Sequence, residues 1–281
     1  MPGLFCELDP GPIPPHKSGM TFRFILALGL GLSLGQTAVA NHLLRVDAGQ
    51  HERSGTPVSF TLPDGGQEHW QLTGPSGKAV AIQTDGLGSA SFIVGKLAAF
   101  QTAVYKLSPA AKPTHSNVVS LVKQNGKLRI TIDDKTVLHY QAEKSGLPRD
   151  DLEPIYRRGG YIHPVLTPSG TVITADYPHN HKHHHGIWFP WTNTIFEGRK
   201  PDFWNMGNGT GTVEFTGLQS QWSGPVHAGF SSSHQFVDLI AKPKKVALTE
   251  TWRIQVYATG QAYHLFELES VQRCASGSKI Q

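Results

Sequence analysis

Short β-prone runs, separated by Gly, Pro, Asn and Asp about every ten residues, constrain this chain more than any other feature. The clearest example is VVSLVKQNGKLRITIDDKTVLHYQ, residues 118–141, where turns are expected at Asn125-Gly126 and Asp133-Asp134. In LRITI, residues 128–132, Leu and Ile alternate with Arg and Thr, so one strand face should be buried and the other solvated. Long helical periodicity is missing. The chain is therefore predicted to be all-β and antiparallel.

The expected strands fall into two groups, divided by the Pro-bearing stretch SPAAKPTH. Residues 41–112 should form a small N-terminal β unit, and residues 113–281 a large antiparallel β-sandwich. In TETWRIQVY, residues 249–257, Trp252, Ile254 and Val256 are expected to face the core. AYHLFELESV, close to residue 281, is expected to be an unpaired edge strand, which predicts that the sandwich lacks C-terminal strands here.

Residues 1–40 are interpreted as an upstream extension and a signal peptide. MTFRFILALGLGLSLGQTAVA, residues 20–40, has a basic Arg23, an apolar run and a closing Ala-Val-Ala. The apolar run is shorter than the ~20 residues that span a membrane. The mature protein should begin at Asn41, lack a membrane span, and be secreted or periplasmic. The net charge of +4 is spread thinly, so no nucleic-acid partner is expected.

Five of the 15 histidines lie in HNHKHHH, residues 179–185. Pro178 before them and Gly186 after them disfavour a helix, which leaves an extended or looped backbone. On an extended chain His181 and His183 would share one face, and His184 would point to the other.

Paired imidazoles supply two of the ligands that a divalent metal such as copper or zinc needs. His181 and His183 are therefore the candidate metal ligands, and a third ligand would come from His163, Asp176, Asp202 or Glu214. The alternative is a solvated His-rich tract that binds metals weakly and without a defined geometry.

Aromatic and basic residues flank the histidines. Ile187, Phe189 and Trp191 would share a core-facing side of an extended strand, whereas Trp188 and Trp204 can form a platform on which a sugar ring stacks.

Two arginines precede the histidines in the sequence. Arg157 and Arg158, next to Gly159-Gly160, can clamp a carboxylate or another anion, and a plain surface pair is the alternative.

The string YIHPVLTPSGTVITADYPHNHKHHHGIWFPWTN, followed by PDFWN, resembles a bacterial family known as methane oxygenase PmoA, which is common in secreted proteins of carbohydrate-degrading bacteria. The resemblance covers roughly residues 150–272. The later string LFELESVQ is similar to the β-sandwich of galactose mutarotase-type proteins. The resemblance therefore implies a mutarotase-like sandwich as the fold.

The family pattern also implies which of the five histidines belong to the motif. Asn180 and His185 depart from it, because an acid and an arginine are expected there. The resemblance thus implies that His179 and His185 are extras. The matching positions are Tyr161 to Pro164, Thr167 to Gly170, His181, His183, His184, Gly186 and Asp202 to Trp204.

Three functions are compatible with these features. The first is an enzyme acting on a carbohydrate as an epimerase, lyase or hydrolase, with His184 or His163 as general acid/base, Asp202 orienting it and Arg158 assisting. The second is the copper-dependent oxygenase that the family name implies. The third is a non-catalytic carbohydrate-binding module built on Trp188 and Trp204.

Overall fold

The fold is all-β, as the sequence predicts. The computed structural model describes residues 24–25, 41–63, 69–112, 115–144 and 146–281. The expected leader, residues 1–40, lies outside the described residues except for Phe24–Ile25, a short strand paired with residues 43–44. Within the described chain no helix has the length and apolarity needed to cross a bilayer.

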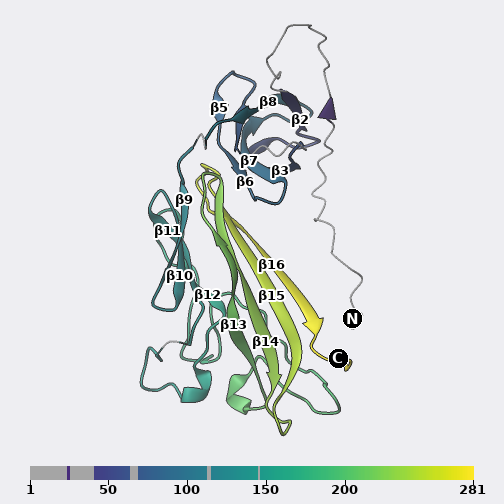
Figure 1. Cartoon of the computed structure of the whole chain (residues 1–281). Helices are drawn as coiled ribbons and strands as arrows, with labels where there is room; N and C mark the ends of the chain where they lie inside the picture. The colour runs from purple at the N-terminus through teal and green to yellow at the C-terminus, as the bar shows by residue number, and fades with distance from the viewer. Residues whose placement is uncertain (1–23, 26–40, 64–68, 113–114, 145) are drawn as a thin grey trace.

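The N-terminal unit consists of two antiparallel sheets packed around their own core (Figure 1). One sheet has the order β1-β2-β8-β4-β5 and the other β3-β7-β6. Leu44, Leu72 and Phe92 are almost fully buried between them. The strands are β1 (Phe24–Ile25), β2 (His42–Asp47), β3 (Arg53–Thr61), β4 (His69–Thr73), β5 (Ala79–Val80), β6 (Ile82–Thr84), β7 (Ser89–Leu97) and β8 (Thr102–Ala110).

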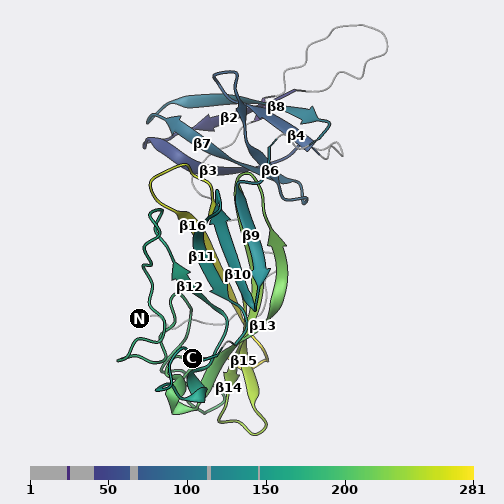
Figure 2. The same cartoon turned by 90° about the vertical axis from the view of Figure 1, so that its left-hand side faces the viewer.

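The rest of the described chain forms a β-sandwich of two four-stranded antiparallel sheets, ordered β12-β11-β10-β9 and β13-β14-β15-β16. Figure 2 shows the two sheets facing each other. The strands are β9 (Val119–Gln124), β10 (Lys127–Ile132), β11 (Lys135–Gln141), β12 (Tyr161–Val165), β13 (Gly211–Trp222), β14 (His227–Asp238), β15 (Lys245–Tyr257) and β16 (Leu265–Cys274). Two 3-10 turns, η1 (Pro154–Tyr156) and η2 (Met206–Asn208), lie in the connections.

Local turn chemistry explains the β9–β11 meander. Asn125 and Gly126 both have positive φ, as do Asp133 and Asp134, and these pairs join the three strands where the sequence predicts turns. Asn, Asp and Gly tolerate this left-handed region better than other residues.

The expected inward positions are largely confirmed. Leu128, Ile130, Trp252, Ile254 and Val256 are all buried in the sandwich core. The expected solvent face was wrong in part. Thr131, beside a register shift in β10, is buried, and so are Gln255 and Tyr257 in β15.

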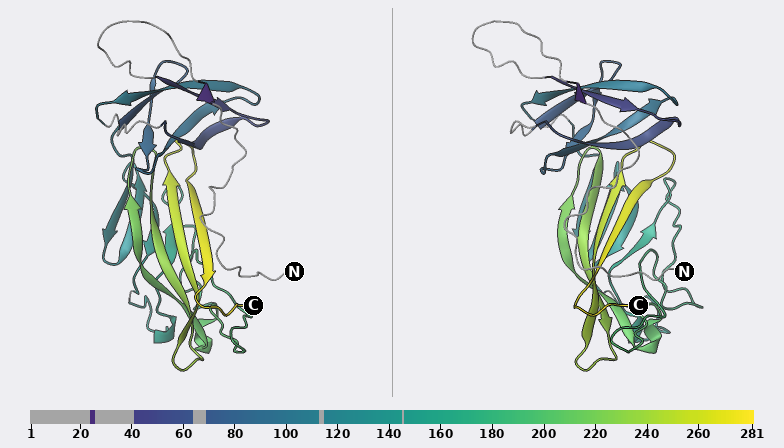
Figure 3. Two further views of the ribbon diagram at one scale, coloured as in Figure 1. Left: turned by 45° about the vertical axis from the view of Figure 1, so that its right-hand side comes forward. Right: turned by 90° about the vertical axis from the view of Figure 1, so that its right-hand side faces the viewer.

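The N-terminal unit stacks on one end of the sandwich, and the long connections of the sandwich gather toward the other end (Figures 1 and 3). Gln83 of β6 ties the two units together, because its Oε1 accepts hydrogen bonds from the backbone N–H groups of Val226 and His227 at 3.1 and 3.0 Å.

Residues 166–210, between β12 and β13, form no strand of their own and carry the histidine-rich sequence. The expectation that Ile187, Phe189 and Trp191 share a buried strand face was wrong. Ile187 does pack against the core, but Phe189 is 42% and Trp191 37% exposed. The reason is that this segment follows an irregular path, so the two-residue alternation of a strand does not apply to it.

Candidate active site

The histidine-rich stretch folds as a compact hairpin rather than as an extended chain. Backbone hydrogen bonds close two successive tight turns, from His181 N to Pro178 O at 3.0 Å and from His184 N to His181 O at 2.9 Å. Tyr177 N donates to His184 O at 2.9 Å, and Asp176 pairs with His185 across the base of the hairpin. The two turns together span residues 178–184.

These turns bring the three motif histidines together. Ring centroids are 5.0 Å apart for His181–His184 and His183–His184, and 5.8 Å apart for His181–His183. The expectation that His184 points away from the other two was therefore wrong, because it assumed the alternation of an extended chain. Burial lowers the pKa values of His183 and His184, and the neighbouring imidazoles lower them further.

His185 is different from the other four histidines, because its side chain is fully buried. Its Nδ1 lies 2.9 Å from Asp176 Oδ1, and Asp176 Oδ2 accepts a 3.0 Å hydrogen bond from the Tyr161 hydroxyl. The Nε2 of His185 is buried and has no hydrogen-bond partner within the described residues. Burial lowers the pKa of His185 to about 4, against the opposing effect of Asp176.

The close passage of the chain at Gly186 fixes this arrangement. Gly186 has φ +40°, and a Cβ at this position would collide with the backbone oxygen of Ile162. Only glycine permits such an approach without strain. Its neighbour Ile187 then exchanges backbone hydrogen bonds with Ile162 at 3.0 Å, which locks His185 against strand β12.

Arg158 lies next to His185 in the interior and is 1% exposed. Its guanidinium carbon is 4.0 Å from the centroid of the Trp188 ring, and its Nη1 has no hydrogen-bond partner among the described residues. Burial lowers the pKa of Arg158 to about 10. The surface-pair alternative was wrong for Arg158 and fits Arg157, which is exposed.

A second buried histidine, His234, is also influenced by the charge of Arg158. His234 Nε2 is 2.7 Å from the Tyr140 hydroxyl, and His234 Nδ1 is 3.4 Å from Glu250 Oε2. Glu250 accepts further hydrogen bonds from Ser270 at 2.5 Å and Gln272 at 3.0 Å. Burial opposes ionisation, yet these hydrogen bonds hold the pKa of Glu250 below its ordinary value. Burial lowers the pKa of His234.

Trp188 and Trp204 connect the interior with the surface histidines. The Trp188 ring lies 5.5 Å from His185 and 5.9 Å from Trp204, and Trp204 lies 5.5 Å from His184. Both indoles are partly exposed. An aromatic wall therefore runs from the surface cluster to the buried His185 and Arg158.

The structure gives Asp202 a role within its own loop. Asp202 Oδ1 accepts hydrogen bonds from the backbone N–H groups of Trp204 and Asn205 at 3.0 and 2.8 Å, and Oδ2 accepts from Asn205 Nδ2 at 2.8 Å and Thr192 Oγ1 at 3.2 Å. Although burial opposes it, these bonds hold the pKa of Asp202 below its ordinary value. Asp202 thus fixes the turn that presents Trp204, and no hydrogen bond joins it to His184 among the described contacts.

His163 lies beside Gly186, where the chain passes close to β12. It is on β12, and its Nδ1 is 2.9 Å from the Thr174 hydroxyl. Burial lowers its pKa.

The residues expected to complete a metal site are engaged elsewhere. Asp176 contacts His185 and Tyr161, His163 contacts Thr174, and Glu214 lies 3.5 Å from Lys144. Among the described residues, no group of three or more His, Cys, Asp or Glu side chains is arranged to hold a metal ion. The surface cluster is thus a set of adjacent rings without a metal-binding geometry.

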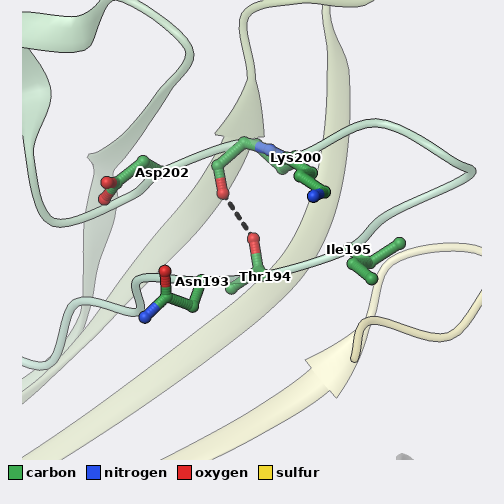
Figure 4. Close-up of a pocket in the computed structure, with 6 residues that line it drawn as sticks. Asn193, Thr194, Ile195, Lys200 and Asp202 are labelled. Carbon is green, nitrogen blue, oxygen red and sulfur yellow. Dashed lines mark hydrogen bonds between the residues drawn. The ribbon is translucent and has the colours of Figure 1, made fainter.

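A shallow pocket of about 230 Å³ lies beside this region (Figure 4). It is lined by residues 193–195 and 200–202, and a hydrogen bond from the Thr194 hydroxyl to the Pro201 carbonyl crosses it. Its lining carries Lys200 and Asp202 but none of the histidines, so the pocket borders the candidate site without containing it.

Sequence reasoning missed part of this cluster. His185 was treated as an extra, Asp176 only as a possible metal ligand, and Tyr140, His234 and Glu250 were not singled out. One sequence signal could have found the last two. His234 and Glu250 occupy core-facing positions in strands whose neighbours two residues away, such as Phe236 and Trp252, are apolar and buried.

The family comparison corrects the resemblance. Residues 127–281, more than half of the chain, match the model of a family of unknown function, DUF6807. The chain belongs to the DUF6807 family. The match contains both sheets of the sandwich except β9, and every residue of the cluster described above. No curated protein matches the sequence significantly.

The description of DUF6807 names neither methane oxygenases nor sugar mutarotases. The assignment to the PmoA family was therefore wrong. The copper-dependent oxygenase hypothesis rested on that assignment and loses its basis.

Proposed function

We propose that this DUF6807 protein is an enzyme that acts on a carbohydrate by acid/base chemistry, with His185 as the proton carrier. The observation that carries this proposal is the asymmetry of the His185 ring. Its Nδ1 faces the Asp176 carboxylate at 2.9 Å, whereas its Nε2 is unpartnered in the described structure. A carboxylate that fixes the tautomer and leaves the other nitrogen free is the arrangement that makes a histidine an effective general base.

The chemical step follows from this geometry. With the proton on Nδ1, the lone pair of His185 Nε2 accepts a proton from a hydroxyl or a carbon of the sugar. The resulting imidazolium is stabilised by Asp176, and the same proton returns to the leaving oxygen or to the product. Burial lowers the pKa of His185 to about 4, so the ring is neutral at neutral pH and the Nε2 lone pair is unprotonated.

Carbohydrate is the proposed substrate class because of the two tryptophans. Trp188 and Trp204 are partly exposed, lie 5.9 Å apart, and connect the surface to His185. Indole faces stack on the apolar faces of sugar rings. We assign the acid/base role to His185 rather than to His184 or His163, because a carboxylate orients the His185 ring, whereas His184 is partly exposed and His163 Nδ1 contacts the neutral hydroxyl of Thr174.

The test is turnover of a panel of oligosaccharides, read as new reducing ends, unsaturated products or epimers. His185→Gln should reduce turnover by about 10²–10⁴-fold, the usual contribution of a general acid/base. His179→Gln is the matched control, because His179 is exposed in the same hairpin. Equal turnover by both variants would show that His185 is not the proton carrier.

A non-catalytic carbohydrate-binding module is the second candidate. It is favoured by the near-complete burial of Arg158 and His185, at 1% and 0% exposure, since a substrate reaches them only after the covering loop moves. Under this hypothesis the sugar stacks on Trp204 at the surface. Binding that is lost in Trp204→Ala, unaffected in His185→Gln and never followed by turnover would favour the module over the enzyme.

A further inference from the structure

Arg158 is buried without a direct ion pair to any carboxylate of the described residues. No carboxylate lies within ion-pair distance of it among the described residues, and its Nη1 has no partner there. Its Nε donates only to the carbonyl oxygen of the adjacent Gly159, at 3.2 Å. Removing one partner of a buried ion pair is strongly destabilising, so a folded protein rarely keeps a buried charge without a function for it.

The two nearby carboxylates are already committed to other groups. Asp176 holds His185 and Tyr161, and Glu250 holds Ser270 and Gln272 and faces His234. The tyrosine hydroxyls near Arg158 are neutral, since burial raises the pKa values of Tyr140, Tyr161 and Tyr177. The interior thus holds Arg158 without a direct ion-pair partner among the described residues, and its Nη1 donor has no hydrogen-bond partner there.

We infer that Arg158 receives the carboxylate of an acidic sugar, so that the substrate class is a uronic acid or an oligosaccharide that contains one. The inference rests on the proposed function, which supplies the sugar as substrate, and adds that this sugar carries a carboxylate. A guanidinium binds a carboxylate through parallel hydrogen bonds, and a single positive charge matches a monoanion.

Trp188 lies between the residue proposed to bind the carboxylate and the residue proposed to transfer the proton. Its ring contacts the Arg158 guanidinium at 4.0 Å and the His185 ring at 5.5 Å. A sugar that stacks near Trp188 would place its carboxylate toward Arg158 and the adjacent carbon or oxygen toward His185 Nε2. The anion receptor and the base therefore serve one sugar ring.

Trp188, which covers the Arg158 guanidinium, belongs to an irregular segment between β12 and β13. Residues 186–205 contain no strand, and Ile162↔Ile187 is the isolated bridge that attaches their start to β12. Displacement of this segment would move the Trp188 ring away from the Arg158 guanidinium and make that guanidinium accessible to a ligand. Binding of the acidic sugar should therefore change tryptophan fluorescence.

Thermal shift and calorimetric titration of the full chain with matched sugars test the inference. Glucuronate and galacturonate should bind and raise the melting temperature, whereas glucose and galactose should not. Arg158→Met should weaken uronate binding about tenfold or more, because a charge-assisted hydrogen bond is lost. Arg157→Met, an exposed neighbour of Arg158, should bind uronates like the unaltered chain.

The melting temperature of Arg158→Met without ligand distinguishes a ligand-binding role of Arg158 from a structural role. If Arg158 is kept for a ligand, its replacement by an apolar side chain of similar length should leave the melting temperature unchanged or raise it. If Arg158→Met does not fold, Arg158→Lys keeps the charge and loses the planar fork, and it should bind uronates more weakly. Unchanged uronate affinity in a folded Arg158 variant would overturn the inference.

The remaining outcomes separate the inference from the proposed function. Equal binding of neutral sugars and uronates, binding of galactose 6-sulfate alone, or binding of no sugar would each overturn the carboxylate assignment. His185-dependent turnover of a neutral oligosaccharide would support the proposed function and would not support the assignment of a uronic acid as substrate. Selective uronate binding that depends on Arg158, without turnover of any substrate, would support the inference about Arg158 and overturn the proposal that the protein is an enzyme.

Discussion

Asp176 and His185 face each other across the base of the histidine-rich hairpin, with Asp176 Oδ1 2.9 Å from His185 Nδ1. Of the five histidines in this hairpin, the one that the structure buries completely is also the one held by a carboxylate. The other four are partly or fully exposed. The hairpin therefore has a surface part made of adjacent rings and an interior part made of one oriented ring.

Asp176→Asn should show whether the Asp176 carboxylate controls the tautomer of His185. The amide removes the negative charge that favours the proton on His185 Nδ1, so the tautomer should shift and turnover should fall by about 10²–10⁴-fold. The loss of charge-assisted contacts should also cost roughly 1–3 kcal/mol of unfolding free energy. Nitrogen NMR of His185 measures the tautomer, and an unaltered Nδ1–H form in Asp176→Asn would contradict this account.

Acid should destabilise the fold through its neutral buried histidines. Burial lowers the pKa values of His185 and His227 to about 4 each. Both pKa values lie below the ordinary 6.5, so between pH 6.5 and 4 the unfolded chain takes up protons that the folded chain does not. The unfolding free energy should therefore fall as the pH drops through this window, by roughly 3 kcal/mol for each of the two.

Urea unfolding at a series of pH values measures this dependence. The variant His185→Gln should show a shallower slope between pH 6.5 and 4 than the unaltered chain. The variant His179→Gln should keep the full slope, because His179 is exposed and its replacement leaves the buried His185 and His227 in place. A slope that is the same in all three proteins would contradict the assignment to His185.

Asp202→Ala should act mainly on the fold of its loop. The carboxylate accepts backbone hydrogen bonds from Trp204 and Asn205, so its removal leaves those donors without their partner and should cost roughly 1–3 kcal/mol. Ligand binding through Trp204 should weaken with it. Had Asp202 oriented His184, the variant would instead lose turnover at unchanged stability, and the comparison of melting temperature with turnover distinguishes the two.

Single alanine substitutions at His181, His183 and His184 should change the unfolding free energy by less than about 0.5 kcal/mol, because these rings lie at or near the surface. Titration with zinc or copper should show weak binding that declines gradually from one variant to the next. One tight stoichiometric site, lost completely in any one of the three variants, would show that the rings rearrange into a metal centre.

Export is a further expected outcome. Strand β2 begins at His42, so cleavage after Ala40 leaves β2 to β16 complete. N-terminal sequencing of protein recovered outside the cytoplasm should give Asn41 as the first residue. Recovery of a chain that still starts at Met1 or Met20 would count against a cleaved signal peptide.

Alternation in the sequence determined the strand content, the β9–β11 meander and most of the sandwich core. This worked because a strand buries every second residue and because Asn-Gly and Asp-Asp pairs turn a chain by their own backbone preferences. Leu128, Ile130, Trp252 and Ile254 are buried for that reason. The concentration of histidines beside Trp188 and Trp204 likewise indicated this region as a candidate site.

Tertiary structure alone decided which of those residues meet. Two tight turns, rather than an extended chain, bring His181, His183 and His184 together, and the close passage at Gly186 moves His185 into the interior. Asp176, Arg158 and Glu250 converge from three different parts of the chain. No local pattern encodes such contacts, because they depend on how two sheets and an irregular connection pack against one another. The sequence indicated the candidate region, and the packing decided which of its histidines is buried and held by a carboxylate.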